Sequence, residues 1–277
     1  MTQMNAPIFI LSEFRSGSTL VRYVLDSHPS VCCPAELRLA ALCQRALQVG
    51  NLLRGVESSG ADTHINAECL GWVRRIIDDA MAAYCERKAK TRWCDKSPAN
   101  IDLSYVLNTV FPDAQYLCLY RHGLDQAYST LAMDGPSRFD WRPARYGGHL
   151  VAAALDRWCS QAEKLLAFEH SNSNCLRVLY ETFVEHPEDE LLRITTFLGL
   201  PHVPGLSVSA FERPHDPGPA DSKISTSTAV DSGRIGKGRA LDMRGVPLGL
   251  QQRFNRLLRV LGYEEAPAST TQHLSVM

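Results

Sequence analysis

The residues best suited to chemistry near the start of the chain are FRSGSTL, residues 14–20. A strand is predicted at residues 7–12, because the continuous apolar run at 8–11 is typical of a strand buried on both faces of a parallel sheet. Ser18 or Thr19 then begins a helix that is predicted to end near the His-Pro pair at 28–29. In such a strand–loop–helix, backbone N–H groups and the helix N-terminus point at an anion. The pattern therefore predicts a phosphate-binding loop, against the alternative of a polar turn capped by Ser18.

This loop departs from the nucleotide-triphosphatase pattern G-x-x-x-x-G-K-[ST] at two positions. Ser12 replaces the first Gly, and Ser18 replaces the Lys that would reach the terminal phosphates. Both differences argue against hydrolysis of ATP or GTP. Arg15 can supply the missing charge, because its guanidinium presents a planar fork of donors that suits a tetrahedral oxyanion.

Two further cations come at the ends of predicted strands. Lys96 directly follows a short predicted strand at 92–95, and Arg121 ends a strong one at 115–121. Ligands of open parallel sheets bind beyond the carboxyl ends of the strands. We therefore expect Arg15, Lys96 and Arg121 to converge at one edge of the sheet.

Strands separated by helical patterns along the whole chain predict an α/β fold, with a parallel β-sheet flanked by helices. A further strand is predicted at 176–180, and irregular segments at 134–146 and 201–239, the first of them over a site. We expect one domain at 1–265 and a flexible tail at 266–277. Further helices are predicted at 37–48, 66–88, 101–110, 124–132, 149–168, 187–198 and 248–261.

Composition narrows the class of protein. The 277 residues include 29 Lys plus Arg and 30 Asp plus Glu, a formal net charge of -1 that argues against a nucleic-acid binder. No apolar run reaches the roughly 18 residues of a membrane span, and no basic region precedes a long apolar segment as in a secretory signal. Nine scattered cysteines, without CxxC or zinc spacing, predict buried thiols and no metal site. We therefore expect a cytoplasmic protein.

The motifs resemble those of sulfotransferases that use 3′-phosphoadenosine 5′-phosphosulfate (PAPS). The family's loop for the 5′-phosphosulfate commonly reads PRSGST, and this chain has FRSGST. The family's 3′-phosphate motif has an Arg that ends a strand and a Ser eight residues later, matched here by Arg121 and Ser129. The wider similarity, over about residues 8–200, is to tyrosylprotein sulfotransferases and their bacterial relatives. Its segments are RSGSTLVRYVLDSHPSVCCPAELR, WCDKSPANIDLSYVLNTVFPDAQYLCLYR and VLYETFVEHPEDELLRITTFLGL.

The resemblance implies a P-loop-like sulfotransferase fold and a set of catalytic residues. Glu36 matches the base that takes the proton from the acceptor hydroxyl, and Lys96 matches the lysine that stabilises the leaving phosphate. Arg15 would hold the sulfuryl group, and Ser227 aligns best with a serine near the 5′-phosphosulfate. Without the family, Glu36 reads as a residue of the first turn of the helix near Leu37, and Lys96 as a surface lysine.

The resemblance also implies the nucleotide contacts. The loop residues Ser16, Gly17, Ser18 and Thr19 would bind the 5′-phosphosulfate together with Arg15. Arg121 and Ser129 would bind the 3′-phosphate, and Tyr180 would contact the nucleotide. Lys237, in GRIGKGR, matches a lysine over the 3′-phosphate, with Arg234 assisting.

Some positions depart from the family's pattern. Met133 stands where relatives have another Arg that contacts the nucleotide. Cys33 and Cys94 lie at positions resembling a cysteine pair of the Golgi enzymes, but no disulfide is expected in cytosol. Residues 207–239 fit the family's closing loop only loosely.

We therefore expect a PAPS-dependent sulfotransferase that releases 3′-phosphoadenosine 5′-phosphate (PAP). It would transfer a sulfuryl group in line to an acceptor hydroxyl, with Glu36 as general base and no metal. Arg38 near the base and the nearly neutral chain favour a small-molecule alcohol or phenol over a peptidyl tyrosine. The alternatives are a P-loop kinase of a small hydroxyl substrate and a non-catalytic nucleotide-binding module. The oligomeric state is not predicted.

Overall fold

A five-stranded parallel sheet forms the centre of the computed structural model, which describes residues 6–55, 66–133, 143–218, 224 and 227–266. The strand order is β2-β3-β1-β4-β5, and every paired strand runs parallel. This arrangement confirms the predicted α/β class. The strands are β1 (Ile8–Ser12), β2 (Val31–Cys32), β3 (Arg92–Lys96), β4 (Gln115–Tyr120) and β5 (Cys175–Leu179).

Strand β1 is the middle strand, and all five of its residues are buried. Ile10 pairs with Lys96 of β3, and Ser12 pairs with Leu119 of β4. The chain leaving β1 therefore enters the loop at 13–17 between the carboxyl ends of two neighbouring strands. This topology brings the predicted anion site and the cations of β3 and β4 to one edge of the sheet.

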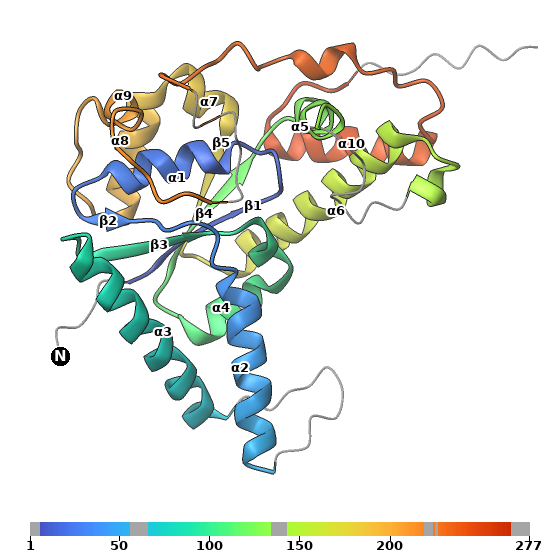
Figure 1. Ribbon diagram of the computed structural model, residues 1–277. Helices are drawn as coiled ribbons and strands as arrows, with labels where there is room; N and C mark the ends of the chain where they lie inside the picture. The colour runs from blue at the N-terminus through green and yellow to red at the C-terminus, as the bar shows by residue number, and fades with distance from the viewer. Residues whose placement is uncertain (1–5, 56–65, 134–142, 219–223, 225–226, 267–277) are drawn as a thin grey trace, which may run out of the picture.

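Two helical layers cover the sheet (Figure 1), and each has its own hydrophobic cluster. On one face, α1, α7, α8 and α9 pack on side chains such as Ile8 and Ile10. On the other, α2 to α6 and α10 pack on side chains such as Phe9 and Leu11. Alternation along β1 explains the division, because successive side chains point to opposite faces. The helices are α1 (Ser18–Ser27), α2 (Leu39–Leu53), α3 (Ala67–Arg87), α4 (Ser104–Val110), α5 (Gly123–Leu131), α6 (Leu150–Ser171), α7 (Tyr180–Glu185), α8 (Pro187–Leu198), α9 (Leu206–Ser209) and α10 (Leu248–Leu261).

Most predicted helices are present, with shifted ends. Helix α2 begins at Leu39 rather than Leu37, and α4 follows a 3₁₀ helix, η1 (Pro98–Leu103). The segment predicted to be irregular at 201–239 contains α9 and the first residues of a 3₁₀ helix, η5 (Lys237–Ala240).

Part of the predicted loop at 134–146 and nearly all of the predicted tail lie outside the described residues, although 143–146 form a 3₁₀ turn. Ala266, the first residue assigned to the tail, is buried and exchanges two hydrogen bonds with Asn255. Organisation as one domain stays a prediction. Among the described helices, none is long and apolar enough to cross a bilayer.

Candidate functional site

The loop after β1 uses two left-handed backbone positions in three residues. Arg15 has φ 66° and Gly17 has φ 91°, and Gly17 is the N-terminal cap of α1. A non-glycine residue in this region is uncommon, and such strain gathers at functional sites. The turn leaves the first N–H groups of α1 facing outward from the helix end, which suits an anion. The structure therefore has the predicted strand–loop–helix geometry at Arg15–Thr19, and binding of a phosphate there stays a prediction.

Tyr180 explains why position 17 is glycine. A Cβ added at Gly17 would lie 2.2 Å from Cδ2 of Tyr180, so the ring packs directly on the loop backbone. Tyr180 begins α7, directly after β5, and is 5% exposed. Burial raises the pKa of its phenol, and Arg121 acts in the opposite direction. The loop and the end of β5 are thus in direct contact.

Arg121, directly after β4, ties three parts of the site together. Its Nη1 donates to the carbonyl of Arg15 (3.1 Å), and its Nη2 donates to the carbonyl of Arg234 (3.2 Å). Its guanidinium carbon lies 4.5 Å from the centre of the Tyr180 ring. Trp158 Nε1 donates to the carbonyl of Arg121 (3.1 Å), which fixes the backbone of this residue. The predicted convergence of Arg15 and Arg121 is therefore observed.

Ser129 is the second member of the predicted Arg–Ser pair. Arg15 Nε donates to Ser129 Oγ (3.1 Å), so the serine on α5 faces back to the loop as its helical position predicts. Met133, two residues beyond α5, is half-buried and brings no charge to the site.

The glycines around Lys237 are bound to the start of α5. Asp125 accepts from the N–H of Gly236 (2.7 Å) and of Gly238 (2.6 Å). A Cβ at Gly238 would lie 2.1 Å from the carbonyl carbon of Leu124, so this turn packs against the helix backbone. Lys237 itself is exposed at the start of η5. Asp125, which the sequence did not single out, thus anchors the segment that carries Lys237.

Glu36 and Lys96 form a buried ion pair. Lys96 Nζ lies 2.6 Å from Glu36 Oε1, with 1% of the lysine side chain and 11% of the glutamate side chain exposed. Lys96 is the last residue of β3 and pairs in register with Ile10, five residues before Arg15. The resemblance implies that this acid and this cation act at opposite ends of one reaction, and in the structure they are direct partners.

A polar cradle after β3 holds the backbone beside Glu36. The Asp95 carboxylate accepts from the N–H of Leu37 (3.4 Å) and of Leu39 (3.4 Å), and also from Ser97 Oγ and Asn100 Nδ2. It is fully buried, and burial raises its pKa while these donors act in the opposite direction.

Two neutral side chains complete this cradle. Ser97 Oγ accepts from the N–H of Arg38 (2.8 Å), and Asn100 Oδ1 accepts from the N–H of Ala40 (3.2 Å). Arg38 is left-handed at φ 54°, which places Glu36 on the turn before α2. The three side chains thereby satisfy the unpaired N–H groups of that helix start. They lie inside the DKSPAN segment, but only Lys96 was singled out from sequence.

Other predicted residues are placed less directly. The N–H of Ser227 donates to the carbonyl of Ile224 (3.0 Å), and Ser227 is half-buried. Cys33 and Cys94 lie side by side as free thiols, and a hydrogen bond between them is one of the causes that raise the pKa of Cys94, after burial.

The atoms around the loop suit a bound oxyanion. Within the described part of the chain, Ser12 Oγ, Ser16 Oγ and Arg121 Nε are buried without a hydrogen-bond partner. Each of these three groups can donate a hydrogen bond, so together they fit a bound oxyanion. Among the described residues there is no group of three His, Cys, Asp or Glu that could hold a metal ion.

Comparison with known sequences follows the same lines. Residues 7–204 match the sequence model described as the Sulfotransferase family. The chain is 31% identical over 202 residues to Protein-tyrosine sulfotransferase A of Caenorhabditis elegans, and 29% identical over 201 residues to Protein-tyrosine sulfotransferase 2 of Gallus gallus. Each alignment covers 70% of this chain, but 50% and 51% of the relatives. The chain thus spans about half the length of these curated relatives.

Solved structures share the fold. The sulfotransferase domain of the Synechococcus PCC 7002 olefin synthase has a TM-score of 0.66 at 25% identity, over 95% of this chain and 98% of that one. The sulfotransferase domain of the curacin biosynthetic pathway has a TM-score of 0.65 at 21% identity, over 95% and 99%. Mouse sulfotransferase SULT7A1, complexed with PAP, has a TM-score of 0.52 at 14% identity, over 92% and 85%. At 21% and 14% identity, the last two show the fold alone.

Proposed function

Because this chain belongs to the sulfotransferase family, we propose that it is an enzyme that transfers a sulfuryl group from PAPS to an acceptor hydroxyl. The observation that carries the proposal is the meeting of Arg15, Arg121 and Ser129 around a loop with unpaired buried polar atoms. A nucleotide with anionic groups at both its 5′ and 3′ positions matches two adjacent sets of donors.

The loop residues Arg15–Thr19 and the start of α1 would hold the 5′-phosphosulfate. Arg121 and Ser129 would hold the 3′-phosphate, because Arg121 Nε is a buried donor in need of an acceptor. Tyr180 and Lys237 would complete the nucleotide site, and Ser227 would lie near the phosphosulfate. The Tyr180 ring, packed on Gly17 and on the Arg121 guanidinium, offers a fixed surface next to both phosphate positions.

When bound, PAPS supplies the sulfuryl group, and the chain supplies charge and a base. Lys96 would turn its ammonium from Glu36 to the bridging oxygen, where negative charge develops. Glu36, released from the ion pair, would accept the proton of the acceptor hydroxyl. Asp95, Ser97 and Asn100 would keep the carboxylate in place by fixing the turn on which it sits.

The acceptor class is the finer part of the proposal. The curated relatives are named for protein tyrosine, whereas the olefin synthase and curacin domains belong to biosynthetic systems. The exposed Arg38 and the nearly neutral net charge favour a small-molecule alcohol or phenol. A cytoplasmic location is part of the same proposal.

Release of PAP from PAPS, measured with a panel of small alcohols, phenols and a tyrosine peptide, tests the activity. The assay is run with EDTA and with Mg²⁺, because the charge at the site is supplied by side chains. We expect acceptor-dependent PAP release that is unchanged by EDTA. Mg²⁺-dependent consumption of ATP, without turnover of PAPS, would instead establish the kinase alternative.

A further inference from the structure

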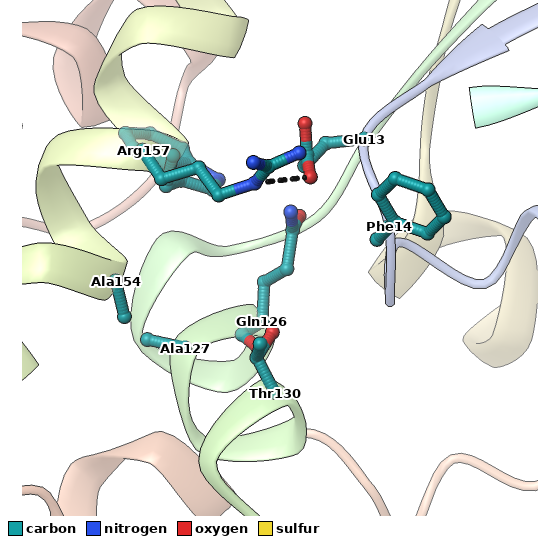
Figure 2. Close-up of a pocket in the computed structure, with 8 residues that line it drawn as sticks. Glu13, Phe14, Gln126, Ala127, Thr130, Ala154 and Arg157 are labelled. Atoms are coloured by element: carbon teal, nitrogen blue, oxygen red, sulfur yellow. Dashed lines mark hydrogen bonds and ion pairs between the residues drawn. The ribbon is translucent and has the colours of Figure 1, made fainter. Parts of the chain in front are cut away.

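A small pocket with both polar and apolar walls lies beside the loop at 13–17, on the side away from Tyr180. Glu13 and Phe14 of the loop meet Gln126 of α5 and Arg157 of α6 there (Figure 2). Tyr180 packs in the hydrophobic cluster on the α1 face, whereas the helices that line this pocket pack on the opposite face. The pocket is therefore separate from the nucleotide contacts of Tyr180.

An ion pair closes one end of the pocket. Arg157 Nε donates to Glu13 Oε1 (2.9 Å), and Glu13 is 8% exposed. Burial raises the pKa of Glu13, with Arg157 and the N–H of Phe14 acting in the opposite direction. The pair is formally neutral, so the pocket has charged walls but no net charge of its own.

Gln126 is a buried residue that lines the pocket. It is 4% exposed, and no hydrogen bond to its side-chain amide is found in the described part of the chain. Figure 2 shows this amide pointing to the gap between Glu13 and Arg157. The Nη groups of Arg157 also lack a hydrogen-bond partner among the described residues. The Arg157 side chain is 30% exposed, so its Nη groups can reach solvent, whereas the Gln126 amide lies on a buried residue and can pair with a polar group bound in the pocket.

The remaining walls limit the size of that ligand. The Arg157 guanidinium carbon lies 5.8 Å from the centre of the Phe14 ring, and Ala127 and Ala154 line the opposite part. The pocket is partly open and has room for about one water-sized group. The terminal O–H or NH₂ of a chain end therefore fits, with the atoms before it at the open side, whereas a peptide group that continues on both sides does not.

The pocket adjoins the proposed binding site of the sulfuryl donor. Phe14 adjoins Arg15, and Thr130, which also lines the pocket, adjoins Ser129. We propose that the pocket is a subsite for the acceptor and takes a small uncharged polar group, a hydroxyl or a primary carboxamide. Because Glu13 and Arg157 neutralise each other, a carboxylate or an ammonium would bring an uncompensated charge into the pocket, whereas an uncharged group with both a donor and an acceptor pairs with the whole set. This inference rests on the proposed function and specifies its acceptor as a small molecule.

Ligand-observed NMR on the PAP-loaded enzyme tests the subsite with phenols that differ only in the tail. The probes are 4-hydroxyphenylacetamide, 4-hydroxyphenylacetate, 4-hydroxyphenethylamine and 4-ethylphenol. We expect the carboxamide to bind about tenfold more tightly than the others, since its analogues leave buried polar groups unpaired. N-acetyltyrosine N-methylamide, whose amides are internal, represents the peptide source and should show no such gain.

Two variants and a control locate the effect. Gln126→Leu should abolish the preference for the carboxamide, and Glu13→Gln should move the preference to the carboxylate, because Arg157 is then unneutralised. Gln252→Leu, at an exposed position of α10, should change nothing. The subsite would be overturned if the carboxamide did not bind or if all probes bound equally. It would also be overturned if the peptide amide gained as much as the carboxamide, or if Gln126→Leu kept the preference. Failure to bind PAP at the outset would count instead against the proposed function.

Discussion

Lys96 Nζ and Glu36 Oε1 lie 2.6 Å apart and are largely shielded from solvent. The charge of the proposed base is therefore neutralised by the cation proposed to stabilise the leaving group. In this arrangement neither residue is available for chemistry. An anion at the end of β3 would compete with Glu36 for the ammonium. Binding of the donor and release of the base are thereby coupled in the proposed mechanism.

Replacing Glu36 with Gln tests the base. Glu36→Gln keeps an oxygen acceptor for Lys96 but cannot take up a proton, so turnover should fall at least about 10²-fold. Binding of PAP, measured by calorimetry, should remain intact. Glu163→Gln, at a partly exposed ion pair, is the matched control and should be near normal. Near-normal turnover of Glu36→Gln would dismiss it as the base.

Asp95→Asn tests the cradle as a positioning device. Asparagine has one acceptor oxygen, and its NH₂ would face donors that Asp95 now accepts from. We expect a loss of about 1–3 kcal/mol in the free energy of unfolding. We also expect kcat to fall while the affinity for PAP holds.

Asp102→Asn, at a half-exposed ion pair with Lys164, provides the comparison for Asp95→Asn. A change in stability without a change in kcat would give Asp95 a purely structural role.

Much of the fold could be predicted from the local pattern of apolar and polar residues, and the elements that were missed or misplaced have physical causes. The apolar runs of β1 and β4 and the Gly-Ser-Thr turn were sufficient to predict the sheet and the start of α1. Strand β2, with only Val31–Cys32, is too short to show a period. Helix α2 begins at Leu39 rather than at the predicted residue 37, because side chains some 60 residues away in sequence accept hydrogen bonds from the N–H groups at its start.

The site was predictable where the residues lie in motifs and not where partners are remote. Arg15, Arg121 and Ser129 were assigned from motifs, and they do meet. Asp125 contacts Gly236 across 111 positions, and Arg157 contacts Glu13 across 144. No local pattern encodes either pair, since each depends on how α5 and α6 pack.

Gly17→Ala separates a steric effect from a backbone effect. The new Cβ would meet the Tyr180 ring at 2.2 Å, in addition to the cost of φ 91° for alanine. Gly199 also has a positive φ, of 66°, but a Cβ added there would meet no atom within 4 Å. Gly199→Ala therefore reports the backbone cost alone, about 1–2 kcal/mol. We expect Gly17→Ala to be less stable than Gly199→Ala and to bind PAP at least about tenfold more weakly. Equal stability and equal PAP affinity in the two variants would contradict packing of Tyr180 on the loop.

Arg121→Ala tests the assignment of the 3′-phosphate. Loss of a charge-assisted donor set should weaken PAP by about 10- to 100-fold. Adenosine 5′-phosphosulfate, which lacks the 3′-phosphate, should be affected far less. Equal losses for the two nucleotides, measured by competition binding, would mean that the 3′ site lies elsewhere.

A thermal-shift comparison of PAP, ADP and ATP tests the central claim most directly, because selective stabilisation reports which nucleotide the native site binds. At a hundred times its Kd, a ligand stabilises the folded state by about 2.7 kcal/mol. The proposed site requires both a 5′- and a 3′-phosphate, so PAP should raise the Tm and ADP and ATP should raise it little, with or without Mg²⁺. Stabilisation by ATP or ADP equal to that by PAP would contradict a PAPS-dependent sulfotransferase.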